Sequence, residues 1–208
     1  MFLGPDAQAD LERYRFHELE SGVQRSTLMT IFANPGLQSL LLYRLSRHIR
    51  TGKRTFGKKL LGAAYPFLSR FNDIVNGIFI SPEATIGPGC YIAHYGGVVI
   101  GAGATIGTNC NIANNTSIGA GSPTLGDRVL VAVGARVVGD IHVGSDVAVG
   151  ANAVVTRDVP DRAVAVGVPA RVVSYAGAFK QVRYPGAETD QDRMLALNAE
   201  VPSISSAR

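Results

Sequence analysis

The 208-residue chain contains no tryptophan, two cysteines and four histidines, and only 17% of its residues are charged. Two cysteines cannot build a disulfide framework, which excludes a small disulfide-stapled fold. No uninterrupted apolar run reaches the ~20 residues that a membrane-spanning helix needs. The start, MFLGPDAQADLE, turns acidic after three apolar residues and does not resemble a signal peptide, so we expect a cytoplasmic protein. With 46% hydrophobic residues, the chain is expected to fold around a core.

Charge is distributed unevenly along the chain. Residues 1–74 carry 11 basic and 6 acidic side chains, whereas residues 75–155 carry 2 and 4. Much of the basic excess lies in one stretch without an acidic residue, made of Arg44, Arg47, Arg50, Lys53, Arg54, Lys58 and Lys59. Two interpretations stay open: a solvated helix end, and a peripheral membrane contact through anionic lipid head groups or a lipid-linked phosphate. No pattern indicates nucleic-acid recognition.

An aliphatic residue recurs at every sixth position through the middle of the chain. The positions are Ile80, Ile86, Ile92, Ile100, Ile106, Ile112, Ile118, Leu125, Val131, Val137, Val143, Val149 and Val155. Two residues are inserted between Ile92 and Ile100, and one between Ile118 and Leu125. Helices repeat at about 3.6 residues and strands at 2, so a period of six fits neither alone. It is typical of a hexapeptide β-helix, a triangular prism with three hexapeptides per coil and the aliphatic residues inside.

The chain divides into three segments. Residues 1–75 are predicted to be helical, with a helix start at Asn34-Pro35 and a second helix over about 58–72, where Pro66 is a kink or a stop. Residues 76–172 are predicted to form the β-helix, whose open first coil the helical segment covers. Residues 173–208 form a C-terminal tail with one short helix or loop, then disorder. The expected fold class is therefore mainly β, a parallel β-helix with an N-terminal helical segment.

Several residues beyond the aliphatic positions also have a predicted place on the prism. Cys90 and Cys110 occupy the same position of the repeat one coil apart, about one strand spacing or ~4.8 Å, and are expected to be packed thiols. Additional apolar residues are assigned to the outer faces, where prisms would pack side by side: Val98, Val99, Val129 and Val138. Three-fold packing would close such an assembly.

The four histidines are the first candidates for acid–base chemistry near neutral pH. His17 and His48 lie on predicted helices, and His142 directly precedes an inward valine, so these three are interpreted as surface or packing residues. His94 differs, because it lies two positions after an inward isoleucine, just before the insertion, and Tyr95 and two glycines follow it. Such an outward loop suits proton transfer near neutral pH. A zinc site of this architecture would need three converging histidines, so no metal is expected.

The repeat register aligns one column of residues on successive coils. His94, Asn114, Val133 and Ala151 each lie two positions after an inward residue. The column is polar at one end, and small and apolar at the other. A long, thin ligand could lie along it, with its reactive end at His94 and Asn114.

Two closing motifs reveal a family resemblance. The repeat, followed by VTRDVP at 155–160 and VGVPAR at 166–171, resembles the hexapeptide acyltransferases of the left-handed β-helix superfamily. Over about residues 30–173 the chain is most similar to serine acetyltransferases and their polysaccharide O-acetyltransferase relatives. The resemblance implies a left-handed helix, acetyl-CoA as donor, and a homotrimer with active sites between neighbouring prisms. Whether two trimers join stays open.

The resemblance also implies roles for individual residues. His94 matches the general base, which takes the proton from an acceptor hydroxyl as its oxygen attacks the thioester. The positions along the pantetheine channel and at the nucleotide end are matched by Gly134, Ala135, Ala151, Gly167 and Arg171. Small residues there let backbone groups reach the pantetheine amides, and the arginine could meet a phosphate.

The chain departs from serine acetyltransferases at three places. They carry an aspartate fifteen residues before the histidine and another directly before it, where this chain has Phe79 and Ala93. They also carry a second histidine in a Gly-Asp-Arg-His-Pro loop, whereas GAGSPT at 119–124 has none. Serine has an ammonium group that these carboxylates would help to hold. The segment YIAHYGGVVI at 91–100 resembles instead the colanic-acid and capsule-type O-acetyltransferases, which retain one histidine here.

We therefore expect an acetyl-CoA-dependent O-acetyltransferase that acts on a sugar hydroxyl of a surface polysaccharide or its precursor. Tyr95, Asn114 and Asn115 are candidates to hold the uncharged acceptor, and Asn114 could also donate to the developing oxyanion. Serine O-acetylation, acetylation of an amino sugar or a small xenobiotic, and a non-catalytic β-helix scaffold stay open as alternatives. A pure scaffold would not bind CoA.

Overall fold

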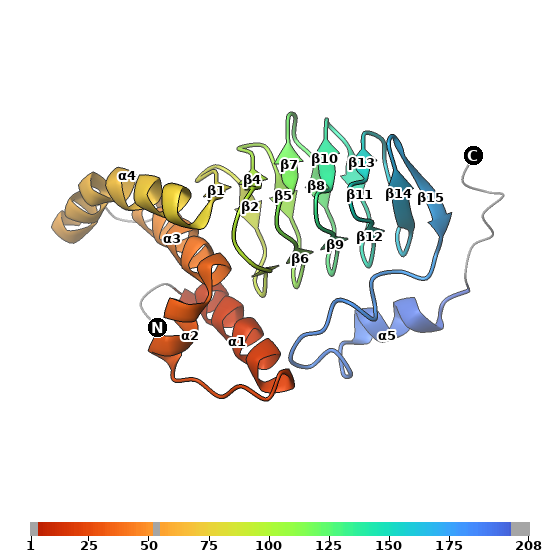
Figure 1. Cartoon of the computed structure of the whole chain (residues 1–208), viewed down its shortest axis with the longest axis horizontal. Coiled ribbons are helices and arrows are strands. Elements are labelled where there is room, and N and C mark those ends of the chain that lie inside the picture. Colours follow the sequence, from red (N-terminus) through yellow and green to blue (C-terminus); the bar gives the residue numbers. More distant parts are fainter. Residues whose placement is uncertain (1–3, 52–54, 201–208) are drawn as a thin grey trace.

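The computed structural model describes residues 4–51 and 55–200. Four helices come first: α1 (Gly4–Glu20), α2 (Thr27–Ala33), α3 (Pro35–Arg50) and α4 (Phe56–Asn76). Short strands then follow from Ile78 to Ser174, and α5 (Gln191–Asn198) lies in the C-terminal segment. Figure 1 shows the first four helices gathered at one end of a row of stacked strands. Within the described ranges, no helix is both long and apolar enough to cross a membrane.

The strands form three sheets, which are the faces of a prism. Sheet A contains β1 (Ile78–Ile80), β4 (Val98–Ile100), β7 (Ser117–Gly119), β10 (Arg136–Val138) and β13 (Val154–Val155). Sheet B contains β2 (Thr85–Ile86), β5 (Thr105–Ile106), β8 (Thr124–Leu125) and β11 (His142–Val143). Sheet C contains β3 (Tyr91–Ile92), β6 (Asn111–Ile112), β9 (Leu130–Val131), β12 (Ala148–Val149), β14 (Val164–Gly167) and β15 (Ala170–Ser174). Only β14 and β15 pair antiparallel among these strands. The predicted parallel β-helix is confirmed, and the structure shows that it has about five turns.

The interior uses two positions of each hexapeptide. The repeated aliphatic residues are buried as predicted, and Ile86, Ile106 and Leu125 stack in register in sheet B. Val98 and Val129 are 1% and 0% exposed, so their predicted place on the outer faces is wrong. Side chains alternate along a strand, and a residue two positions before an inward aliphatic therefore also points inward. Of the other two assigned valines, Val99 is 45% exposed and Val138 is half-buried.

The two cysteines are free and buried, as expected of packed thiols. Strands β3 and β6, which directly follow the two cysteines, pair with each other, so the cysteines lie on neighbouring coils. Burial raises the pKa of both thiols, that of Cys110 to about 12. The Cys110 thiol donates to the Gly126 carbonyl at 3.3 Å. Both side chains therefore act as small apolar core residues.

The helical segment covers the open edge of the first coil, as predicted. The Tyr14 hydroxyl of α1 donates to the Ile92 carbonyl at 2.9 Å and accepts from the Ile92 amide at 3.0 Å. The Tyr43 hydroxyl of α3 likewise donates to the Ala84 carbonyl and accepts from the Ile86 amide. These backbone groups have no further coil to pair with, and an unpaired strand edge is a site of aggregation. The two tyrosine hydroxyls therefore make the hydrogen bonds that a preceding coil would otherwise make.

Two helix details differ from the predictions. Helix α3 begins at Pro35, but the Asn34 side chain makes no capping bond and instead donates to Glu18 and to the Thr30 carbonyl. Pro66 lies inside α4, which runs through it to Asn76, so the predicted stop is wrong. The helix ends where Gly77 adopts a left-handed conformation, φ 63°, and donates to the Asp73 carbonyl. Contacts with α3 hold the helix past the proline.

The basic stretch is not one continuous cationic surface. Arg44 is 5% exposed and pairs with the buried Asp10 of α1, and Arg50 pairs with Glu83. Lys53 and Arg54 lie outside the described residues. The interpretation as a solvated helix end therefore holds for only part of the basic stretch, because Arg44 is buried in the core.

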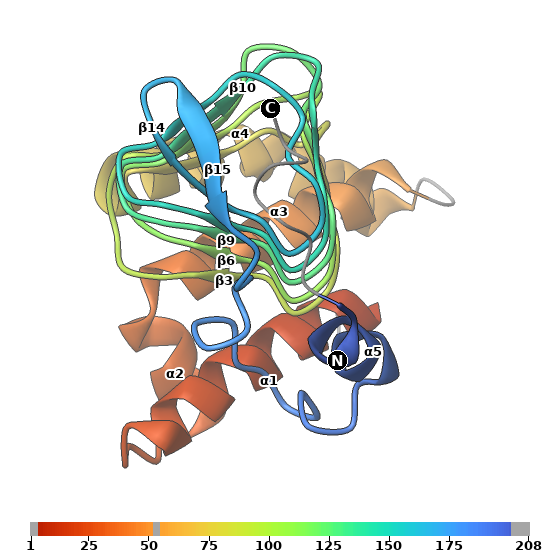
Figure 2. The same ribbon diagram turned by 90° about the vertical axis from the view of Figure 1, so that its right-hand side faces the viewer.

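The C-terminal segment packs back along the outer face of sheet C. Figures 1 and 2 show it returning from β15 toward α1, with α5 beside the prism. The Ala178 amide donates to the Asp146 carbonyl at 2.8 Å, and the Asn111 side chain donates to the Gln181 carbonyl at 3.1 Å. The short helix expected in the tail is present as α5, whereas the disorder expected beyond it falls on residues 201–208, outside the described residues.

His17 lies where α1 meets sheet C. Its ring packs on Tyr91 with centroids 4.2 Å apart. Burial, and then the charges of Arg13 and Arg183, lower the pKa of His17 from 6.5 to about 4. The Glu20 carboxylate at 3.6 Å favours the protonated form but does not offset burial. His17 is thus a packing residue, as the sequence indicated, and it stays neutral near pH 7.

This lowered pKa predicts an acid-dependent loss of stability. Between pH 6.5 and 4 the unfolded chain binds a proton at His17 that the folded protein does not, so stability falls as the pH decreases through that window. We expect the free energy of unfolding in urea to drop by about 1–2 kcal/mol between pH 7 and pH 5 from this residue. His17→Gln should lose that part of the pH dependence, and His48→Gln should retain it. An unchanged pH dependence in His17→Gln would contradict the assignment.

Candidate active site

The strand that leads to His94 is fixed from two helices. Besides the two Tyr14 hydrogen bonds to Ile92, α3 approaches so closely that a Cβ on Gly36 would lie 2.2 Å from the Ile92 carbonyl oxygen. On the other side, the Ala93 amide donates to the Ile112 carbonyl at 2.9 Å. The backbone just before His94 is thus held by α1, α3 and the next coil. Sequence reasoning did not find Tyr14 or Gly36.

The two inserted residues form an outward loop at His94. His94 has φ 65°, in the left-handed region, and both His94 and Tyr95 are exposed. The Gly96 amide donates to the Asn76 carbonyl, and its own carbonyl accepts from the Asn115 amide, each at 2.9 Å. Gly97 is required where it is, because a Cβ there would lie 2.9 Å from the Asn115 Cα atom. The loop is therefore anchored on both sides and presents His94 to solvent.

The strand register confirms the predicted alignment of the column. Ile92, Ile112, Val131, Val149 and Ala165 are successive partners in sheet C. The residues two positions after them are His94, Asn114, Val133, Ala151 and Gly167, each at least partly exposed. Four strand spacings give the column a length of roughly 19 Å. A long ligand with one reactive end fits this shape.

The remaining predicted donor-site residues lie around the column in different ways. The Gly134 amide donates to the Asn114 carbonyl at 3.2 Å, and a Cβ on Gly134 would lie 2.0 Å from the Asn152 side-chain oxygen. Ala135 is 0% exposed, so the whole residue belongs to the core and presents no surface to a ligand. Arg171 is exposed on β15, next to Gly167 at the far end of the column. The structure therefore places Gly134 and Arg171 beside the column, whereas Ala135 lies in the core.

Arg136 is a neighbour of the column that sequence reasoning did not single out. Its guanidinium donates to the backbone carbonyls of Asn115 and Gly134. The side chain therefore ties the corner residues of two coils together and places a fixed positive charge there. One signal was available, because Arg136 is one of only 2 basic residues between 75 and 155. Asn115 itself is exposed, with φ 58°.

The chain is apolar at the two positions where the resemblance has carboxylates. Phe79 is 43% exposed on the outer face of sheet A and is in register with Val99. Ala93 is half-buried directly before His94. Within the described part of the chain, no group of three His, Cys, Asp or Glu side chains could hold a metal ion. A cationic acceptor would therefore find no carboxylate at either of these two positions.

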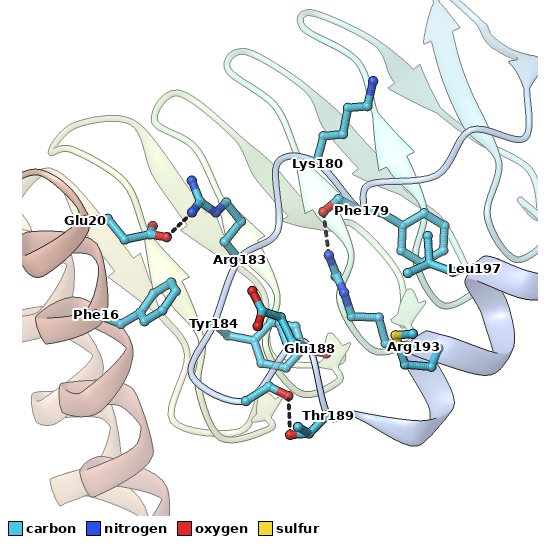
Figure 3. A pocket seen from close by; sticks show the side chains of 13 residues that line it. Phe16, Glu20, Phe179, Lys180, Arg183, Tyr184, Glu188, Thr189, Arg193 and Leu197 are labelled. Carbon is cyan, nitrogen blue, oxygen red and sulfur yellow. Dashed lines mark hydrogen bonds and ion pairs between the residues drawn. The ribbon is translucent and has the colours of Figure 1, made fainter.

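A separate cavity of about 820 Å³ lies between α1 and the C-terminal segment. Phe16 of α1 and Tyr184 form part of its wall, and Arg183 pairs with Glu20 at its edge (Figure 3). Arg193 is tied to the Phe179 carbonyl at 2.6 Å. None of the residues predicted for the site lines this cavity. The His94 column is instead an open corner of the prism.

Comparison with known proteins gives consistent similarities. No protein-family model matches the chain. The chain is 39% identical over 162 residues to a serine acetyltransferase of Helicobacter pylori, covering 74% of this chain and 91% of that protein. It is 37% identical over 155 residues to a serine acetyltransferase of Mycobacterium tuberculosis, covering 71% of this chain but only 65% of the relative.

Solved structures agree with these similarities. A serine acetyltransferase in complex with CoA matches with a TM-score of 0.67 at 26% identity, over 80% of this chain and 67% of the other. Soybean serine acetyltransferase without ligand matches with the same TM-score at 32% identity, over 81% and 67%. The similarity supports the left hand of the β-helix. A resemblance to colanic-acid or capsule-type enzymes is not shown by these comparisons.

Proposed function

Because the chain belongs to the serine acetyltransferase family, we propose that it is an acetyl-CoA-dependent O-acetyltransferase with His94 as general base. The observation that carries this proposal is the column, with an exposed histidine and Asn114 at one end and small residues at the other. The similar structure that holds CoA supports the choice of donor. The proposed reaction takes place in the cytoplasm.

The proposed chemistry is direct transfer. The neutral imidazole of His94 accepts the proton of the acceptor hydroxyl while that oxygen attacks the carbonyl carbon of the thioester. The side-chain amide of Asn114, one coil away, donates to the oxygen on which negative charge develops. The thiolate of CoA then leaves and takes the proton from the imidazolium. No covalent bond to the enzyme is formed.

The donor would lie along the small-residue part of the column. Ala151 and Gly167 are exposed and carry a small side chain or none, which leaves room for the pantetheine arm beside Gly134. Arg171 at the end of the column would meet a phosphate. Since the column is an open corner, we propose a homotrimer in which a neighbouring prism closes it, and the exposed Val133, Val99 and Phe79 support this.

Two acceptors have support from different observations. The names of the relatives favour L-serine, the alternative left open by the sequence, more than they favour a saccharide. The saccharide of the original expectation is supported by Phe79 and Ala93, which offer no carboxylate to an ammonium group. Tyr95, 70% exposed, and the neighbouring asparagines could bind an uncharged sugar by stacking and hydrogen bonds.

Thiol release from acetyl-CoA tests the proposal. L-serine would be compared with sugars, nucleotide sugars and short polysaccharide fragments, and CoA binding would be measured by calorimetry. Turnover with L-serine would establish the acceptor named for the relatives, and turnover with a saccharide alone would establish the sugar. A chain that neither binds CoA nor releases thiol with any acceptor would contradict the proposal and favour the scaffold.

Filling the column should block the donor. Ala151→Trp places a large ring on the predicted path of the pantetheine arm, and we expect KM for acetyl-CoA to rise by about tenfold or more. Thr85→Trp, on the exposed outer face of sheet B, is the matched control and should leave KM unchanged. Equal KM values in the two variants would show that the donor does not lie along the column.

A further inference from the structure

Helix α4 turns its apolar side away from the rest of the chain. Its exposed side chains are large: Phe56 is 84% exposed, Phe67 79%, Ile74 72%, Phe71 69% and Leu60 64%. At 100° per residue these five positions fall within a 60° sector of the helix. They form one continuous stripe, which we call the α4 stripe. Figure 1 shows α4 at the outer side of the helical segment, projecting away from the β-helix.

The side of α4 that packs inward is mainly polar. Asn76 is its only buried residue among those described, and the Asn76 amide donates to Gln38 at 3.1 Å. The Ser39 hydroxyl donates to the Asn72 side-chain oxygen at 3.1 Å. A surface helix of a globular protein normally buries its apolar side and exposes its polar side. In α4 the arrangement is reversed, so the α4 stripe does not serve the core of this chain.

The charges of α4 indicate what covers the α4 stripe. Lys59 and Arg70 are exposed along one edge of it, and Lys58 adds a third positive charge at the start of the helix. Asp73 is the only acidic residue of α4, and it is half-buried, with its pKa raised by burial. Two copies of α4 packed together would bring like charges near one another. An anionic surface would neutralise them instead.

We propose that α4 lies in the plane of an anionic lipid bilayer, with the α4 stripe among the acyl chains and its basic residues at the head groups. Aromatic and aliphatic residues on one side of a helix with lysine and arginine beside them are typical of interfacial helices. At 21 residues α4 is about 31 Å long, and it does not have the composition of a spanning helix. This inference is independent of acetyl transfer.

Vesicle co-sedimentation of the full chain tests the inference. The probes are vesicles of phosphatidylcholine alone and vesicles with about a quarter phosphatidylglycerol. We expect binding to the second kind only, weakening as salt screens the basic residues. The Phe67→Ser/Phe71→Ser variant should bind at least tenfold more weakly, and Leu195→Ser, which alters an equally exposed leucine of α5, should bind like the original.

A second pair of measurements keeps the test decisive if the phenylalanine variant folds poorly. Lys59→Gln/Arg70→Gln changes only exposed charges and should reduce binding to the anionic vesicles several-fold. Hydrogen exchange should show α4 amides becoming protected only when these vesicles are added. Absence of vesicle binding would overturn the proposal, as would binding that neither variant changes. Protection of α4 without vesicles, lost together with the oligomer in Phe67→Ser/Phe71→Ser, would show that a second copy of the chain covers the α4 stripe.

Discussion

Replacing His94 with alanine is expected to reduce acetyl transfer by about 10²–10⁴-fold while CoA binding is unchanged. The exposed loop is anchored through the backbone of Gly96 and Asn115, so removal of the imidazole leaves the loop and the column in place. Of the described residues placed at this end of the column, only His94 carries a base that is suited to accept the proton of the acceptor hydroxyl. The loss should appear in kcat, measured as thiol release, rather than in the KM for acetyl-CoA.

The matched control for His94 is His142→Ala. His142 is exposed on sheet B, where its backbone amide donates to Asp158 and its carbonyl accepts from the Val159 amide, so its side chain should not affect turnover. Equal activity of His94→Ala and the unaltered protein would remove His94 from the mechanism. Loss of CoA binding in His94→Ala would show that the histidine holds the donor instead of acting as a base.

Replacing Asp10 with alanine is expected to lower the free energy of unfolding by about 3–5 kcal/mol. Asp10 is 0% exposed, and its carboxylate accepts from the Arg44 guanidinium at 2.9 Å and from the Cys90 amide at 3.1 Å. Arg44 in turn donates to the Ile86 and Gly87 carbonyls at the open edge of the first coil. The substitution leaves a buried guanidinium without its main counter-charge and weakens the attachment of the helices to the prism.

Urea unfolding followed by circular dichroism measures this effect. Glu83→Ala is the control, because Glu83 and its partner Arg50 form an ion pair in which both side chains are about half exposed. Water and salt screen such a pair, so its loss should be far smaller. An Asp10→Ala variant that unfolds at the same urea concentration as Glu83→Ala would show that the buried pair does not fasten the helices to the first coil.

Much of the prism and of the column followed from the sequence because a β-helix is built from local repeats. Each coil contacts only its neighbours, so a six-residue period fixes both the inward positions and the register between coils. His94, Asn114, Val133 and Ala151 could be aligned by counting alone. Counting failed at Val98 and Val129, where the alternation of side chains gives each hexapeptide a second inward position.

The tertiary structure alone decided how the helices and the tail attach to the prism. Tyr14 reaches Ile92 across 78 residues, and Asp10 reaches Cys90 across 80. No spacing in the sequence signals such pairs, since they depend on which side of each helix meets the first coil. The same holds for α4, which packs the amides of Asn72 and Asn76 inward and leaves its large apolar side chains exposed. Periodicity determines the repeat because its contacts are local, whereas the orientation of the helices depends on long-range packing.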